Sequence, residues 1–106
     1  MQNEYAFKLS PKADRDLDEI YQYIFLELKN PKAADDLIDD FEKAFINLEK
    51  FPQSCPLSVN ALLKRKGYRK LVVNNYIALY KLDVKRKLII IMHVFYGAMD
   101  YENKGL

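Results

Sequence analysis

The hydrophobic pattern divides the chain into a helical N-terminal part and a C-terminal part of strands. Residues 4–9 alternate between apolar and polar side chains, and this period of two predicts a short strand. Two stretches of helical period follow. Each begins with a capping residue and a proline, Ser10-Pro11 and Asn30-Pro31, which is typical of a helix N-terminus.

The two predicted helices pair as a hairpin. The first ends by Asn30, because Pro31 disfavours helical backbone in the residue before it. Its buried stripe is predicted to be Leu17, Ile20, Tyr21, Ile24 and Leu28. The apolar face of the second helix is predicted to be Ala34, Leu37, Ile38, Phe41, Phe45 and Leu48. Since the connection is very short, the helices should run antiparallel.

Three strands are predicted after a loop at residues 51–60 and a segment at residues 61–66, which is either one helical turn or a continuation of the loop. They span residues 68–73, 76–82 and 88–95. The first two strands are joined by a two-residue turn at Asn74-Asn75, because asparagine tolerates the positive φ of such turns.

The third of these strands, LIIIMHVF, is apolar at both its odd and its even positions. Such a strand is expected at the centre of a sheet, covered on both faces. Simple alternation places Ile90, Met92 and Val94 on one face and leaves the other face to Ile89, Ile91, His93 and Phe95.

Length and pattern together predict one α+β domain over residues 1–106: an N-terminal strand and a helical hairpin packed on a mainly antiparallel sheet of about four strands.

The lone Cys55 excludes a disulfide within the chain and a multi-cysteine zinc site. Without a neighbouring base, it is read as a bystander. No metal or cofactor is expected. No signal pattern or apolar run of about 20 residues is present, so a cytoplasmic location is expected, without a membrane partner.

Charge is distributed unevenly between the two parts. Residues 1–58 hold seven Lys or Arg and twelve Asp or Glu, whereas residues 59–106 hold ten and three. The basic part could contact nucleic-acid phosphates. The alternative is that its lysines serve solubility and edge protection. The acidic helix surface is likewise read as a solvated face, or as a surface that meets a basic partner.

A basic cluster opens the strand region and is the first candidate site. It consists of Lys64, Arg65, Lys66, Arg69 and Lys70. When RNA is cleaved by its own 2′-hydroxyl, negative charge develops on the phosphorus centre, and Arg or Lys can stabilise it. Arg69 is the best single candidate because it lies on a strand. A surface arginine without a catalytic role is the alternative.

His93 and two tyrosines are the other candidates. The only histidine of the chain could act as a general acid or base near neutral pH. Its apolar neighbours fit a structural histidine equally well. Tyr96 and Tyr101 could stack on a base or relay a proton, although most of the eight tyrosines must serve packing.

In its ordered motifs, the sequence resembles the RelE/ParE family of toxins from type II toxin–antitoxin modules. The matching positions are Ser10-Pro11, Ala13, Asp16-Leu17, Ile20, Phe51-Pro52, Gly67-Tyr68-Arg69, Asn75-Tyr76, Tyr80, Gly97 and Asp100-Tyr101. The resemblance implies a helical hairpin on an antiparallel-rich sheet. It also implies a small cognate antitoxin, through which operator DNA would be bound.

The family divides by activity, and the resemblance leaves the activity open. RelE-like members cut mRNA on the ribosome, and ParE-like members inhibit DNA gyrase. Arg69 matches the arginine that contacts the phosphate in mRNA-cutting members. His93 stands where many relatives carry arginine, and Ala98 and Met99 stand where many carry basic residues.

The leading hypothesis from the sequence is a ribosome-dependent mRNA endonuclease without a metal. Arg69 would stabilise the phosphate, and His93 or Tyr96 would transfer protons. The RNA backbone would be held by Lys64, Arg65, Lys66 and Lys70. The alternatives are a non-enzymatic gyrase inhibitor and a weakly toxic member that acts mainly as antitoxin partner and co-repressor.

Overall fold

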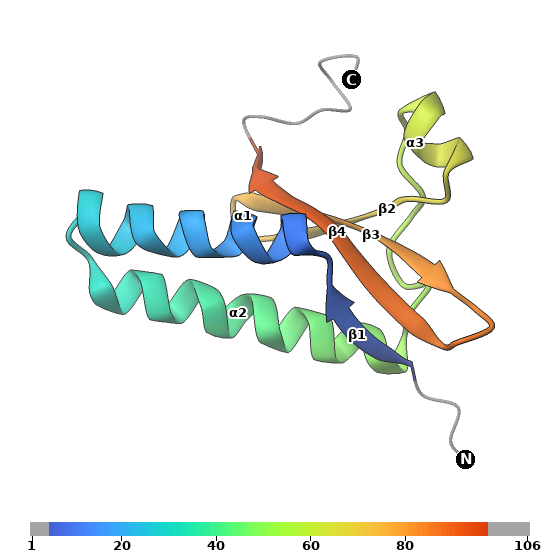
Figure 1. The fold of residues 1–106 in the computed structure, drawn as a ribbon, viewed down its shortest axis with the longest axis horizontal. Coiled ribbons are helices and arrows are strands. Elements are labelled where there is room, and N and C mark those ends of the chain that lie inside the picture. Colours follow the sequence, from blue (N-terminus) through green and yellow to red (C-terminus); the bar gives the residue numbers. More distant parts are fainter. Residues whose placement is uncertain (1–4, 98–106) are drawn as a thin grey trace.

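The computed structural model describes residues 5–97 as a helical hairpin beside a four-stranded sheet (Figure 1). The elements in chain order are β1 (Ala6–Leu9), α1 (Pro11–Gln22), the π-helical turn η1 (Tyr23–Glu27), α2 (Pro31–Lys50), α3 (Ala61–Arg65), β2 (Arg69–Val73), β3 (Tyr76–Asp83) and β4 (Leu88–Tyr96). The predicted fold class is confirmed. The predicted boundaries of the last three strands are correct to within one residue.

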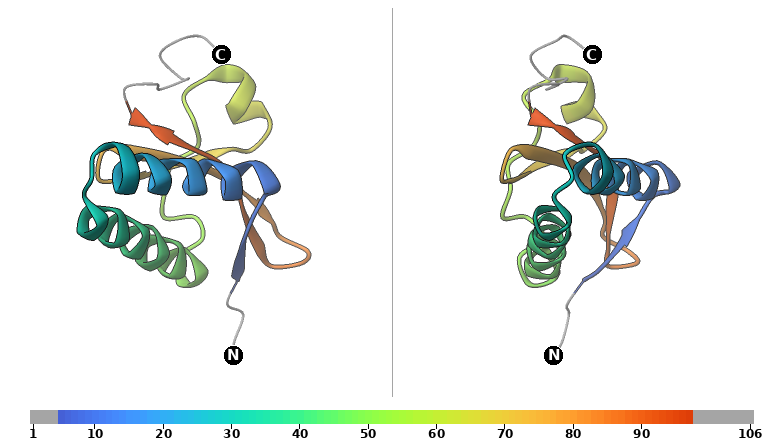
Figure 2. Two further views of the ribbon diagram at one scale, coloured as in Figure 1. Left: turned by 60° about the vertical axis from the view of Figure 1, so that its left-hand side comes forward. Right: turned by 90° about the vertical axis from the view of Figure 1, so that its left-hand side faces the viewer.

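The strands lie in the order β1-β4-β3-β2, which confirms that β4 is central. β1 pairs with β4 in parallel, whereas β4, β3 and β2 are antiparallel neighbours. The turn between β2 and β3 has Asn74 at a φ of 54°, as asparagine permits. The helical hairpin and α3 lie on different sides of this sheet in the two views of Figure 2.

Both predicted helix caps are confirmed. Ser10 Oγ accepts a hydrogen bond from the Ala13 N–H at 3.0 Å, and Asn30 Oδ1 accepts one from the Ala33 N–H at 3.1 Å. The prediction that Leu28 is buried is wrong, since 55% of it is exposed. The wider π-helical turn after Gln22 shifts the helical phase, so a stripe extrapolated at 3.6 residues per turn no longer faces the sheet. None of the helices within residues 5–97 is long and apolar enough to cross a membrane.

Two apolar clusters occupy opposite faces of the sheet. The larger joins the helical hairpin to side chains of β3 and β4 such as Ala78, Tyr80 and Ile91. In the smaller cluster, Leu63 of α3 packs against strand residues that alternate with those of the larger cluster: Ile77, Leu79 and Phe95. Because adjacent strand residues point to opposite faces, the first cluster defines a hairpin face and the second an α3 face.

The predicted alternation along β4 is wrong after Ile91. Leu79 pairs with His93 and Tyr80 with Ile91, so Met92 is an extra residue that faces no partner in β3. Such a bulge moves each later residue of the strand to the face opposite to the one that simple alternation predicts. Val94 therefore joins Ile89 and Ile91 on the hairpin face, and His93 takes the α3 face with its partner Leu79.

The two outer strands are covered differently. The N–H groups of Tyr5 and Phe7 donate to the Glu49 carbonyl and to its Oε2, at 3.1 and 3.2 Å. This closes the outer edge of β1 with the end of α2. At β2, the Lys70 N–H donates to the Pro56 carbonyl at 3.2 Å, so the loop before α3 covers the first part of the strand. Bonds of this kind block pairing with other chains.

Gly97 ends β4 against the β2–β3 turn. Its N–H donates to the Asn75 carbonyl at 2.6 Å, and a Cβ at this position would lie 2.9 Å from the same oxygen. Gly97→Ala should therefore lower the free energy of unfolding by about 1–3 kcal/mol, because the turn must move. Urea unfolding checks this against Val84→Ala, a change at an exposed position. Equal stability of the two variants would contradict it.

Candidate functional site

The α3 face brings His93 and Lys70 onto one surface. His93 pairs with Leu79, and Leu79 pairs with Lys70, so the three residues form one row across β4, β3 and β2. Paired residues project from the same face. With strands about 4.8 Å apart, roughly 10 Å separates the backbones of His93 and Lys70. A flexible lysine can span much of that distance.

Further basic residues surround this row. Lys8 pairs with Ile90, which pairs with Lys81, so both lysines share the α3 face. The Lys81 Nζ lies 5.9 Å from the centre of the Tyr68 ring, a cation–π contact. The predicted RNA-binding residues of α3 and its C-cap are exposed: Lys64, Arg65 and Lys66. Lys8 and Lys81 were not among the predicted site residues, although their alternating positions within the strands could have revealed them.

Arg69 lies on the hairpin face, away from His93. It pairs with Tyr80, a residue of the larger apolar cluster. Its Nη1 donates a hydrogen bond to the Cys55 carbonyl at 2.6 Å. The guanidinium therefore fastens the loop of residues 51–60 to β2. Tyr80 anchors the same loop from the same face, since its hydroxyl donates a hydrogen bond to the Pro52 carbonyl at 2.9 Å.

Tyr96 belongs to a groove on the hairpin side. The groove has a volume of about 620 Å³ and lies between α1, η1 and the ends of β3 and β4. Tyr96 is 50% exposed and meets the Tyr76 ring edge-on, with ring centres 5.5 Å apart. Tyr23 and Leu28 continue the apolar surface, each 55% exposed. Strand pairing places Tyr96 and His93 on opposite faces of β4, although Tyr96 also lines a smaller hollow with Lys70 and Ile77 of the α3 face. Tyr101 lies outside the described residues.

The electrostatic surroundings of His93 favour its neutral form. Partial burial lowers its pKa, nearby Lys12 adds to this effect, and Asp16 opposes it. A neutral imidazole can accept a proton at neutral pH. Within residues 5–97, no group of three His, Cys, Asp or Glu side chains is placed to hold a metal ion.

The lowered pKa of His93 predicts a pH dependence of stability. Below the ordinary value of 6.5, an unfolded chain binds a proton at this position that the folded chain resists. The free energy of unfolding should therefore fall as the pH drops below 6.5, and it should fall less in His93→Gln. Urea unfolding of both proteins between pH 5 and 7.5 checks this, and parallel curves would contradict it.

The comparisons with known proteins agree on the fold. A model of the ParE toxin of the type II toxin–antitoxin system parDE matches residues 7–101. A chain of the chromosomal ParDE system from P. aeruginosa is 22% identical, with a TM-score of 0.68 and coverage of 90% of this chain and 98% of the other. A chain of the RelBE2 toxin–antitoxin complex from Mycobacterium tuberculosis is 20% identical, with a TM-score of 0.63 and coverage of 88% and 98%.

No curated protein matches the sequence. The structural likenesses, at these identities, concern the fold, whereas the family model matches nearly the whole sequence, including most of β1, both long helices and all later strands. The chain therefore belongs to the family of ParE toxins of type II toxin–antitoxin systems.

Proposed function

We propose that this toxin acts without cleaving RNA, by binding DNA gyrase and inhibiting it. The observation that carries the proposal is the position of Arg69. Its guanidinium is engaged with the Cys55 carbonyl, on the face of β2 opposite to His93. A catalytic arginine must reach the charge that develops on the phosphorus centre. This arginine instead stabilises a loop.

The positions of the remaining candidates support the same proposal. General acid–base catalysis requires groups within hydrogen-bond reach of one reacting centre. His93 lies on the α3 face, whereas Tyr96 lines the groove on the hairpin side. The match to ParE toxins adds to this argument, since gyrase inhibition is the activity that the family resemblance implies for ParE-like members.

A supercoiling assay tests the proposal. Purified toxin is added to gyrase and relaxed plasmid, and supercoiling is expected to fall with toxin concentration. The matched variant His93→Gln should inhibit equally, because a binding surface elsewhere does not need the imidazole. Gyrase activity that is unchanged at a large molar excess of folded toxin would contradict the proposal.

Ribosome-dependent mRNA cleavage is the second candidate, and the basic α3 face favours it. On that face, His93 could take the proton of the 2′-hydroxyl while Lys70 and Lys81 bind the phosphates. Primer extension on translated mRNA tests it. Codon-linked cuts that disappear in His93→Gln and persist in Arg69→Lys would favour this candidate over gyrase inhibition.

A cognate antitoxin is the proposed partner of the toxin. Both similar structures belong to toxin–antitoxin systems, ParDE and RelBE2. The exposed apolar residues of η1 and its flank offer surface for such a partner: Tyr23, Phe25, Leu26 and Leu28. Expression of the toxin alone separates an active toxin from a weakly toxic co-repressor, because unimpaired growth would favour the co-repressor.

A further inference from the structure

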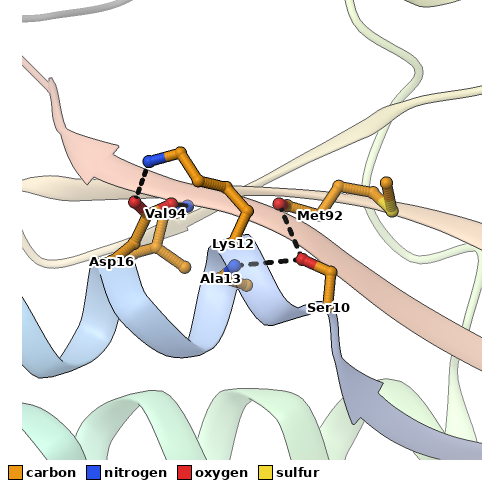
Figure 3. A network of polar contacts seen from close by, with 6 residues as sticks. All are labelled: Ser10, Lys12, Ala13, Asp16, Met92 and Val94. Carbon is orange, nitrogen blue, oxygen red and sulfur yellow. Dashed lines mark hydrogen bonds and ion pairs between the residues drawn. The ribbon is translucent and has the colours of Figure 1, made fainter.

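The bulge at Met92 lies beside the start of α1, where two polar side chains form hydrogen bonds with the backbone of β4 (Figure 3). β1 ends at Leu9, which pairs with Ile91. Beyond this point, α1 takes the place of β1 beside β4. The Ser10 N–H donates to the Ile91 carbonyl at 2.9 Å, and the Ser10 hydroxyl donates to the Met92 carbonyl at 3.0 Å.

Asp16 completes this set of contacts two residues further along β4. Its Oδ2 accepts a hydrogen bond from the Val94 N–H at 2.9 Å, and its Oδ1 pairs with the Lys12 ammonium. Only 6% of Asp16 is exposed. Burial of a carboxylate is costly unless hydrogen bonds and an opposite charge compensate it. Both kinds of compensation are present, so the contact with Val94 is a specific feature of the fold.

The bulge decides which side chains face which surface. Without it, unbroken alternation would turn His93 to the hairpin face with Ile91, and Tyr96 to the α3 face. With it, His93 joins Lys70 on the α3 face, and Tyr96 joins Tyr76 at the groove. The composition of both surfaces therefore depends on one extra residue in β4.

We propose that Asp16 and Ser10 are positioning residues, which fix the bulge at Met92 and thereby set the faces of His93 and Tyr96. Neither residue needs to touch the target of the toxin for this role. The inference does not depend on whether the toxin inhibits gyrase or cleaves RNA. Its test consequently uses spectroscopic signals of β4 rather than toxicity.

Nuclear magnetic resonance of Asp16→Ala tests the proposal. Loss of a buried hydrogen bond to a charged acceptor should speed exchange of the Val94 amide by about tenfold to hundredfold. Cross-strand contacts between Leu79 and His93 should weaken. Asp16→Asn keeps an acceptor oxygen and should restore the Leu79–His93 contacts. Asp14→Ala removes an exposed carboxylate of the same helix as a matched control.

Two results would overturn the proposal. One is a folded Asp16→Ala protein with unchanged Leu79–His93 contacts. If Asp16→Ala does not fold, Ser10→Ala decides, with Asn30→Ala as the control for loss of a helix cap. Ser10→Ala should weaken the Leu79–His93 contacts and Asn30→Ala should not. Equal spectra of β4 in these two variants would likewise overturn it.

Discussion

Replacing Tyr80 by alanine is expected to lower the free energy of unfolding by about 3–5 kcal/mol. None of the Tyr80 side chain is exposed, and it fills the apolar cluster under the helical hairpin. Its hydroxyl also donates to the Pro52 carbonyl at 2.9 Å. Since small domains are stable by about 5–15 kcal/mol, the loss should leave the toxin close to unfolding. Urea unfolding measures it.

Tyr80→Phe separates the two contributions of this residue. It keeps the ring and removes the donor to Pro52, so the expected loss is only about 1–3 kcal/mol. Burial raises the pKa of Tyr80, so the unfolded chain ionises this residue above pH 10 while the folded chain retains the proton. The wild type should therefore lose stability above pH 10 more steeply than Tyr80→Phe. Equal slopes would show that the buried hydroxyl of Tyr80 does not retain its proton above pH 10.

Phe41→Ala should cost a comparable amount, about 3–5 kcal/mol. Phe41 is 1% exposed and connects α2 with the sheet. Its ring centre lies 5.8 Å from that of Phe45 and 6.0 Å from that of Tyr76, where the contact is edge-on. Truncation removes both aromatic contacts and leaves a cavity between helix and sheet. Calorimetry should show a large drop in Tm.

Ile46→Ala is the matched control for this change. Ile46 lies on the same helix with 46% of its surface exposed, so its truncation should change stability by no more than about 0.5 kcal/mol. A loss in Ile46→Ala similar to that in Phe41→Ala would mean that the face of α2 described as buried is assigned incorrectly.

The helical hairpin and the strand boundaries could be predicted because their signals are local. Ser10-Pro11 and Asn30-Pro31 mark the starts of both helices, and the observed caps use those side chains. The Asn74-Asn75 pair likewise marked the turn between β2 and β3. Each of these signals involves residues within a few positions of one another, so no knowledge of the tertiary structure was needed.

The bulge in β4 could not be predicted from its own residues. The run LIIIMHVF is apolar at both odd and even positions. A shift of the strand by one residue therefore does not change its hydrophobic pattern. The cause lies some 80 positions earlier in the chain, in Ser10 and Asp16. Among the acidic residues of α1, only the fold distinguishes the buried Asp16 from its exposed neighbours Asp14 and Asp18.

Arg69 illustrates the same limit for the candidate site. Its position on β2 was predicted correctly, but its direction depends on strand pairing and its partner on the path of the loop of residues 51–60. That loop has no periodic pattern from which its path could be derived. The sequence therefore left open whether Arg69 is catalytic or a surface residue, and its observed contact is with the carbonyl of Cys55.

A toxin that acts by binding gyrase does not need His93 as a catalytic group. The direct test is growth of cells that express the toxin without antitoxin, comparing the wild type with His93→Gln at equal protein levels. Equal growth arrest by both proteins is expected. Normal growth with His93→Gln, together with arrest by the wild type, would contradict it.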